Sequence, residues 1–408
     1  VENITKEKIE TIEEKAKELA KKGMQVIAIA SKKEYSGANI FNEKDENNMT
    51  FIGLVGFLDP PKNDVKQTIR DLRKYGINTK VITGDNPYAT ENICSLVGIE
   101  GDILLGTDLE KMTDDELSKK VEEVNIFARM NPMQKERIVK ALRKNGHVVG
   151  YMGDGVNDAA SLHSADVGIC VNTGADIAKE SSDIILLEKS LKVILDGVLE
   201  GRKVYANIEK YMKLAISSDF GDVFSILIAS IFLPFLPLLP IQMLIQDFLF
   251  QFSQIAIPYD RVDEEYIINP RKWNTKNLGR FMVVMGMTSS VIDVLAFLSF
   301  WFILGYNSVS NEAYFQTAWF IECLISQTLI IHFIRTEKMP FIQSRASKPL
   351  AIMSLVTVIG TIIVPLFLNE IPEFHFVILP IKFYLIVLIL NLIYTIIAQI
   401  VKIAYIKR

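Results

Sequence analysis

Residues 201–233 form one continuous stretch that limits the possible folds of this chain more than any other part of the sequence. It reads GRKVYANIEKYMKLAISSDFGDVFSILIASIFL, and as a single helix it would extend roughly 50 Å. A bilayer core is about 30 Å thick, so such a helix can cross the core and still project from it. Most of its charged residues come before residue 214, and the later part is apolar except for Asp219 and Asp222. The stretch therefore predicts a membrane helix with a soluble extension.

The two aspartates are the unusual residues of this stretch, because a carboxylate at bilayer depth costs a few kcal/mol or more. Residues three apart share a helix face, so we expect Asp219 and Asp222 both to face a helix bundle. The alternative is a solvated helix end, which the apolar sequence after Asp222 disfavours. A carboxylate pair inside a membrane indicates a path for a cation. The soluble extension of the helix indicates that movement of the cation along this path is driven rather than passive.

Composition divides the chain into a soluble half and a membrane half. Hydrophobic residues make up 50% of the 408 residues and charged residues 23%, but no apolar run before about residue 200 is long enough to span a bilayer. The net charge of −4 gives no indication of nucleic-acid binding. Cys94, Cys170 and Cys323 lie far apart, without the spacing of a metal site or a disulfide framework.

The soluble half alternates predicted helices and strands. Helices are expected at residues 6–22, 65–76, 87–98, 108–124 and 132–145, and strands at 24–31, 49–58, 78–83, 126–130, 147–152, 165–171 and 183–188. This alternation predicts an α/β domain with a parallel sheet covered by helices on both faces. In such sheets, ligands bind at the carboxyl ends of the strands.

Polar residues suited to phosphate chemistry follow these predicted strands. Thr83, the Gly84 amide and Asp85 stand where one strand ends, and a hydroxyl with backbone N–H groups can hold phosphate oxygens. Lys135 lies near the start of a helix and can supply positive charge to a phosphoryl group. The turn at residues 153–158, GDGVND, offers Asp154 and Asp158, whose carboxylates suit a hard cation.

Taken in this order, the motifs resemble those of the P-type ATPases, whose phosphorylation domain is a haloacid-dehalogenase-like Rossmann fold. Residues 59–62, DPPK, resemble the hinge motif, residues 83–86 the TGD motif, Lys135 the phosphate lysine and residues 153–158 the GDGVND motif. The resemblance implies ATP and Mg²⁺ as cofactors. It assigns the residues as follows: a hinge at Asp59 and Pro60; catalysis by Thr83, Gly84, Asp85, Lys135 and Asn157; and the catalytic Mg²⁺ at Asp154 and Asp158.

The phosphorylated aspartate of this family is missing. No DKTGT motif occurs in the sequence, so the chain alone cannot form the aspartyl-phosphate. The resemblance implies the tail of a nucleotide-binding domain at residues 1–57, a phosphorylation domain at 58–200 and a stalk helix with a transmembrane domain at 201–408. Together with the start at Val1, it predicts a truncated product and a missing amino-terminal partner segment that carries the nucleophile.

About six apolar runs predict a bundle of about six membrane spans. They lie at about 214–233, 238–257, 281–304, 317–334, 350–368 and 376–400. Lys and Arg occur in the loops at 260–280 and 335–348 but not in those at 305–316 and 369–374. By the positive-inside rule, the soluble half and the carboxyl terminus face the cytoplasm, in a multi-pass protein of the plasma membrane.

Acidic and amide side chains inside the spans are the expected ligands of the transported cation. By resemblance to the fifth and sixth spans of the family, and by position in a later span, they are Asp219, Asp222, Asp247, Gln251 and Glu322. Hard oxygen ligands favour Mg²⁺, Ca²⁺ or protons over thiophilic metals. Asp293 also lies mid-span, where either a place on the path or a hydrogen bond between helices would explain it.

Several stretches, among them 252–267 and 319–347, resemble the bacterial magnesium-transporting P-type ATPases more narrowly. We therefore predict the carboxyl-terminal part of an ATP-driven cation pump in the lipid bilayer, with Mg²⁺ as the favoured ion. Three alternatives stay open: a pump for Ca²⁺ or another cation, a non-catalytic remnant or regulatory membrane subunit, and a membrane-anchored phosphatase. The phosphatase would need a DxDxT nucleophile, which the sequence lacks.

Overall fold

The computed structural model describes residues 5–32, 46–47, 49–58, 60–272 and 274–406. The chain forms two compact units, residues 1–198 and 199–408, and each is described by itself. Asp59 of the expected hinge lies outside the described residues. Pro60 lies in the connection between a strand and the next helix and is exposed.

An antiparallel strand pair with a helix opens the first unit. β1 (Met24–Ser31) pairs with β2 (Thr50–Leu58), with Met24 opposite Leu58, and α1 (Lys6–Lys21) packs against the pair. These three elements follow the predicted bounds closely. Asn92 of α3 (Pro87–Val97) donates a hydrogen bond to the Lys21 carbonyl oxygen, which joins α1 to α3.

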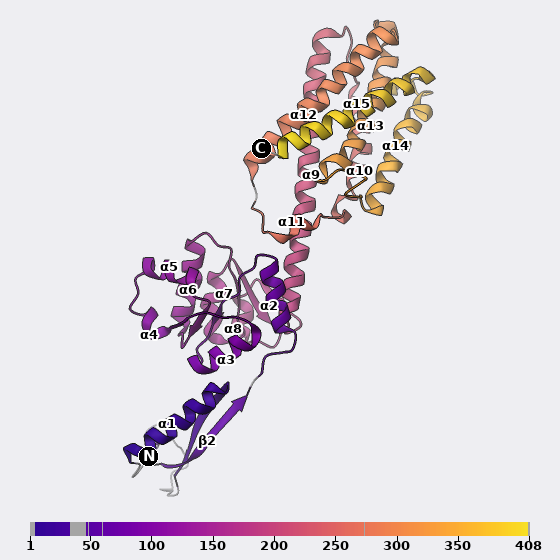
Figure 1. Cartoon of the computed structure of the whole chain (residues 1–408). Coiled ribbons are helices and arrows are strands. Elements are labelled where there is room, and N and C mark those ends of the chain that lie inside the picture. Colours follow the sequence, from indigo (N-terminus) through magenta and orange to yellow (C-terminus); the bar gives the residue numbers. More distant parts are fainter. Residues whose placement is uncertain (1–4, 33–45, 48, 59, 273, 407–408) are drawn as a thin grey trace. The chain divides into compact units, whose positions relative to one another are not determined.

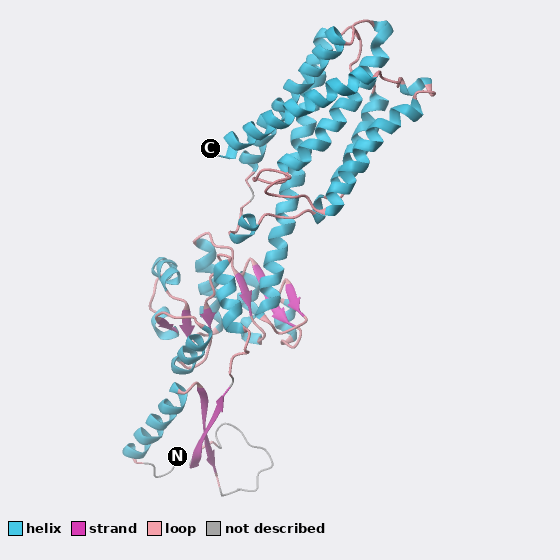
Figure 2. Ribbon diagram, turned by 45° about the vertical axis from the view of Figure 1, so that its right-hand side comes forward, coloured by secondary structure: helices cyan, strands magenta, loops and turns pink. Residues whose placement is uncertain are grey.

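The parallel strands form two sheets rather than the single predicted one (Figure 2). One has the order β3 (Val81–Ile82), β5 (Ile126–Ala128), β4 (Ile103–Leu105), and the other the order β6 (Gly150–Met152), β7 (Val167–Val171), β8 (Ile184–Leu186). β3 and β6 are therefore both edge strands. Ile82 and Val149 nevertheless pack against the same buried cluster. Among the described residues, no strand lies between these two edges to join the sheets.

Three helices of the first unit, α3, α5 (Asp114–Glu123) and α6 (Pro132–Lys144), begin after residues whose side chains cap them. α2 (Val65–Lys74) and α6 match the prediction, as does α3, which Asn86 caps and Gly98 ends at a φ of 82°. The predicted helix at 108–124 is instead two, α4 (Gly106–Leu109) and α5, because Thr113 and Glu116 form a capping box that starts a new helix. β4 and the short helices α7 (Ala159–Ser164) and α8 (Asp176–Glu180) were not predicted.

The long helix is α9 (Leu191–Phe232), shown as one continuous helix in Figure 1. It has 42 residues and so extends roughly 63 Å at about 1.5 Å per residue. It begins earlier than predicted, after Ser190, whose hydroxyl accepts a hydrogen bond from the Lys192 amide at 3.2 Å. Residues 191–200 of this helix, which the prediction left out, include the poor helix former Gly197.

Five of the helices among the described residues are long and apolar enough to cross a membrane. They are α9, α12 (Thr275–Leu298, extended by a π-helical turn to Ile303), α13 (Glu312–Ile334), α14 (Lys348–Leu368) and α15 (Ile381–Ile406). The predicted span at 238–257 is wrong in length: α10 (Pro240–Gln254) has 15 residues, about 22 Å. It starts at Pro240 and is followed by a 3-10 turn around Pro258.

α13 is the central helix of the second unit. It contacts α10, α12, α14 and α15, and most of its residues from Phe315 to Phe333 are buried. Aromatic rings fill the contacts around it, including Phe297 against Trp319 at 5.0 Å between ring centroids. Polar residues on α13 therefore face protein from several sides.

Two glycines let α9 and α12 touch backbone to backbone. A Cβ on Gly286 would stand 2.9 Å from the Ser217 carbonyl oxygen, and one on Gly221 would stand 3.1 Å from the Gly286 carbonyl oxygen. The Ser290 hydroxyl donates to the Gly221 carbonyl oxygen at 3.0 Å across the same contact. This close contact between α9 and α12 fixes the position of Asp222, the residue after Gly221, relative to the neighbouring helices.

Replacing Gly286 with alanine should destabilise the second unit by about 1–3 kcal/mol, because the added methyl group meets backbone atoms that cannot move aside cheaply. Gly279 on the same helix is the matched control, since nothing lies within 4 Å of its Cβ position. Gly279→Ala should be neutral or slightly stabilising. Thermal unfolding of the detergent-solubilised variants measures both. Equal midpoints for the two variants would show that the contact between α9 and α12 is not tight.

Candidate functional site

Lys135 and Asp158 form a partly buried ion pair in the first unit. Lys135 Nζ lies 2.8 Å from Asp158 Oδ1, and both side chains are 13% exposed. The Tyr151 hydroxyl donates to the same oxygen at 2.9 Å, and the Gly155 amide donates to Oδ2 at 3.2 Å. Asp158 thus accepts hydrogen bonds at both carboxylate oxygens and holds the Lys135 ammonium in place.

The electrostatics of this pair follow from those contacts. Burial by itself raises the pKa of the Asp158 carboxyl, but the hydrogen bonds from Lys135 and Tyr151 outweigh it and hold the pKa below its usual value. Burial, together with the nearby Asp158 charge, raises the pKa of the Tyr151 hydroxyl. At neutral pH the site therefore contains an ionised Asp158 and a neutral Tyr151.

The turn after β3 is held by its own side chains. The Thr83 hydroxyl donates to Asp85 Oδ2 at 2.9 Å and accepts from the Asp85 amide at 3.1 Å. Gln25 of β1 donates to Asp85 Oδ1 at 2.9 Å. A Cβ on Gly84 would meet the Met130 carbonyl oxygen at an ordinary 3.5 Å, so sterics alone do not require this glycine. The turn carries a hydroxyl at a strand end, as predicted.

Asp154 is the accessible carboxylate of the GDGVND turn. It pairs with Lys189 Nζ at 3.0 Å, and both side chains are more than half exposed. Asn157 is also exposed, whereas Asp158 is turned inward toward Lys135. A Cβ on Gly153 would stand 2.5 Å from the Asp158 Cβ, so only glycine fits there. The turn therefore separates two carboxylates, one outward and one inward.

This separation bears on the expected Mg²⁺ site. Asp154 fits a metal ligand, because its carboxylate is exposed and already attracts a cation, the Lys189 ammonium. Asp158 fits a supporting role, since protein donors hold both its oxygens. Sequence reasoning missed Lys189, which carries no motif signal. Within the described ranges, no three Asp, Glu, His or Cys side chains lie together in a way that would hold a metal.

The five expected ligands of the transported cation divide into two groups. Asp222 and Glu322 face the interior of the second unit: Gln327 Nε2 donates to Asp222 Oδ2 at 2.6 Å, and Glu322 is fully buried. Asp219, Asp247 and Gln251 are exposed on α9 and α10. The expectation that Asp219 and Asp222 both face the bundle is therefore wrong for Asp219. The 60° between residues three apart places it at the edge of the packed face.

The exposed acids are still close to one another. Asp219 and Asp247 interact electrostatically across α9 and α10, although they share no hydrogen bond. Gln251 lies one turn beyond Asp247 on the same exposed helix face. These three residues form a polar strip on the surface of the second unit, which we call the outer group. Asp222 and Glu322 are the inner group.

Buried polar side chains surround the inner group. Gln246 of α10 donates to Cys323 Sγ at 3.2 Å, and Cys323 lies 3.5 Å from Asp222 Oδ1. Both carboxylate oxygens of Glu322, and the amide oxygens of Gln246 and Gln327, are buried without a hydrogen-bond donor. Such oxygens are costly unless something positive reaches them. The sequence analysis missed Gln246, because it was not recognised as facing inward.

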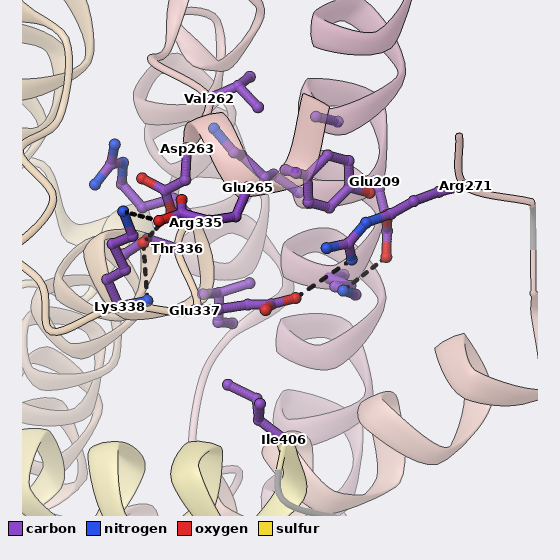
Figure 3. Close-up of a pocket in the computed structure, with 15 residues that line it drawn as sticks. Glu209, Val262, Asp263, Glu265, Arg271, Arg335, Thr336, Glu337, Lys338 and Ile406 are labelled. Atoms are coloured by element: carbon purple, nitrogen blue, oxygen red, sulfur yellow. Dashed lines mark hydrogen bonds and ion pairs between the residues drawn. The ribbon is translucent and has the colours of Figure 1, made fainter. Parts of the chain in front are cut away.

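A cavity of about 330 Å³ lies within the second unit beside residues 206–213 of α9 (Figure 3). Its wall carries paired charges, including Arg271 with Glu337 at 3.4 Å and Lys213 with Glu209 at 2.7 Å. Asp260 is buried next to this cavity and forms ion pairs with two of the lining residues. Its Oδ2 lies 2.8 Å from both Lys210 Nζ and Arg335 Nε, and its Oδ1 accepts from the Ser347 amide at 3.0 Å. Several charged side chains of the cavity wall are thus held in ion pairs within the chain.

Comparison with known proteins agrees with this architecture. Residues 3–166 match the model of the haloacid dehalogenase-like hydrolases, and residues 235–404 match the model described as "Cation transporting ATPase, C-terminus". A "Magnesium-transporting ATPase, P-type 1" of Salmonella typhimurium is 49% identical over 361 residues, covering 88% of this chain and 40% of that protein. The chain belongs to the P-type cation-transporting ATPases.

Two further relatives place it within the P-type ATPases. The "Magnesium-transporting ATPase, P-type 1" of Escherichia coli strain K12 is 47% identical over 85% of this chain and 39% of its own length. A "Calcium-transporting ATPase" of Bacillus subtilis is 33% identical over 79% of this chain and 37% of its own length. The chain spans about two-fifths of the length of these relatives. It contains the haloacid-dehalogenase-like domain and the carboxyl-terminal membrane part of a multi-pass membrane protein, and P-type ATPases in general use ATP and Mg²⁺.

Proposed function

We propose that this chain acts as the carboxyl-terminal part of an ATP-driven pump that moves Mg²⁺ across the plasma membrane. The nucleophilic aspartate would come from sequence amino-terminal to this chain. The observation that carries the proposal lies at the inner group: beside Asp222, both carboxylate oxygens of Glu322 and the amide oxygens of Gln246 and Gln327 are buried with no donor. A cation or a proton would compensate such oxygens in a membrane interior.

In the first unit, the chain's own residues would handle the phosphoryl group. The Lys135 ammonium, held by Asp158, would neutralise phosphoryl oxygens, and Thr83 with the Gly84 amide would donate hydrogen bonds to them. Asp154 would hold the catalytic Mg²⁺, which supplies further positive charge when bound. Asn157 and Asp158 would support the turn, and Asp85 would orient Thr83.

The transported ion would meet both groups of the second unit. The outer group, Asp219, Asp247 and Gln251, lies on a surface that further spans of the complete pump would cover. The inner group holds the ion deeper in the bundle. Oxygen ligands of this kind suit Mg²⁺ and also Ca²⁺. The charge of the loops supports an orientation with the soluble unit and the carboxyl terminus in the cytoplasm.

The test is ion transport by the complete pump carrying Asp222→Asn. We expect loss of Mg²⁺ uptake into cells that depend on the pump, with normal amounts of protein in the membrane. Asp154→Asn should instead block phosphorylation while ion binding remains. Unchanged Mg²⁺ uptake in Asp222→Asn would contradict the assignment of Asp222 to the ion site. If the unaltered pump transports Ca²⁺ but not Mg²⁺, the proposed ion is wrong and Ca²⁺ takes its place.

A further inference from the structure

Asp293 joins three helices at the depth of the inner group. It lies on α12 and is 2% exposed. Its Oδ2 accepts a hydrogen bond from the Ser225 hydroxyl of α9 at 2.7 Å, and its Oδ1 accepts one from the Trp319 indole N–H of α13 at 3.0 Å. Each oxygen thus has a neutral donor from a different helix.

The groups that face Asp293 come from every neighbouring helix. Its donors Ser225 and Trp319 stand one helical turn from Asp222 on α9 and from Glu322 on α13. Both acids interact with Asp293 electrostatically, and so does the buried Tyr394 hydroxyl of α15. No cation of the described chain pairs with Asp293. Three carboxyl groups therefore share one buried region, and they concentrate negative potential there.

The three acids differ in their hydrogen bonds. Asp222 accepts from Gln327 and Cys323, and Asp293 accepts from Ser225 and Trp319, whereas Glu322 accepts none. Donors to a carboxylate favour its charged form. Asp222 and Asp293 each have two such donors, and Glu322 is the acid whose oxygens are left for a ligand.

We infer that Asp293 determines the affinity of the inner group for divalent cations by its charge, without coordinating the ion. Both its oxygens are occupied by protein donors, so it acts through the field it adds at Glu322 and Asp222. Because the attraction scales with the charge of the ion, a third carboxylate favours divalent over monovalent cations. The inference rests on the proposed function, since it concerns the ion that the inner group would hold.

The expected result is a weaker ion site in Asp293→Asn. Asparagine keeps the shape of the side chain but removes its charge, so Mg²⁺ affinity should fall by at least about tenfold. The concentration of Mg²⁺ for half-maximal transport should rise by a similar factor, while the rate at saturating Mg²⁺ changes less. A merely structural role would lower the rate and the stability instead.

The experiment uses the complete purified pump. Binding of Mn²⁺ is measured by electron paramagnetic resonance, with Mg²⁺ as competitor, and thermal midpoints are recorded alongside. Two further variants keep the charge while disturbing the hydrogen bonds: Trp319→Phe, which removes the indole donor, and Asp293→Glu, which moves the carboxylate. Both should stay within about threefold of the unaltered affinity. They also keep the inference testable if Asp293→Asn does not fold.

Three outcomes would overturn the inference. The first is binding of Mn²⁺ by Asp293→Asn within twofold of the unaltered pump, and the second is a loss of affinity in Trp319→Phe as large as that in Asp293→Asn. The third applies if Asp293→Asn does not fold: a loss of affinity in both Trp319→Phe and Asp293→Glu would then overturn the inference. The proposed function fails separately, when Glu322→Gln leaves Mn²⁺ binding and Mg²⁺ transport unchanged.

Discussion

Asp260→Asn should destabilise the second unit by about 3–5 kcal/mol, because it leaves two buried cations without a counter-charge. Lys210 on α9 and Arg335 after α13 both lie 2.8 Å from the same Asp260 oxygen, and the Arg335 side chain is 3% exposed. Asparagine is close in shape, so little packing is lost. The expected loss is therefore the repulsion and desolvation of the two unpaired cations.

The effect should depend on pH in a defined direction. Burial alone raises the pKa of the Asp260 carboxyl, but Lys210 and Arg335 more than offset this, so its pKa lies below the usual value. A depressed pKa in the folded state gives stability that is fully present above the unfolded value of about 3.9 and is lost as the pH falls through the folded value. The difference in the free energy of unfolding between Asp260→Asn and the unaltered chain should be constant near neutral pH and should become smaller below about pH 4.

A nearby exposed pair supplies the control. Lys338 and Glu265 lie 2.8 Å apart, with side chains 38% and 66% exposed, and such pairs contribute little. Glu265→Gln should leave the thermal midpoint of the solubilised chain almost unchanged, while Asp260→Asn lowers it clearly. Equal shifts would mean that the buried ion pairs add no more than surface charges do. A gap that widens in acid would contradict the sign of the pKa shift.

The sequence predicted best what depends on local chemistry. Helix caps, apolar runs and the GDGVND and TGD turns are short-range features, so α3, α6 and the turn that carries Asp154 and Asp158 could be located from residues alone. The soluble and membrane halves followed from hydropathy for the same reason. The motif residues were expected to lie at strand ends, and Thr83 and Asp154 follow β3 and β6.

What depends on which helix face meets which neighbour could not be predicted. Asp219 and Asp222 differ by 60° around α9, and only packing against α13 decides that Asp222 meets Gln327 in the inner group while Asp219 is exposed. Asp293 was ambiguous between a path residue and a hydrogen bond between helices, because its donors Ser225 and Trp319 are 68 and 26 residues away. The two-residue strand β3 is likewise too short to show how the sheets divide.

Lys135→Met should slow phosphoryl transfer in the complete pump by about 10²–10³-fold, the usual loss for one positioned donor to a charged transition state. Asp158→Asn should cost less, because the lysine remains and only its position is released. Asp158 touches Lys135 at 2.8 Å and acts through it. The double variant should therefore be no slower than Lys135→Met alone.

Lys135 and Asp158 should also be coupled in stability, by about 0.5–3 kcal/mol in a double-mutant cycle. Removing either partner leaves the other partly buried and unpaired. Lys140→Met on the same helix is the control: its ion pair with Glu136 has a lysine that is 62% exposed, and its loss should change neither rate nor stability much. Additive losses in rate for Lys135→Met and Asp158→Asn would contradict the arrangement. Asp158 would then act on the reacting group directly, as a metal ligand beside Asp154, and the inward turn of its carboxylate would not describe the working site.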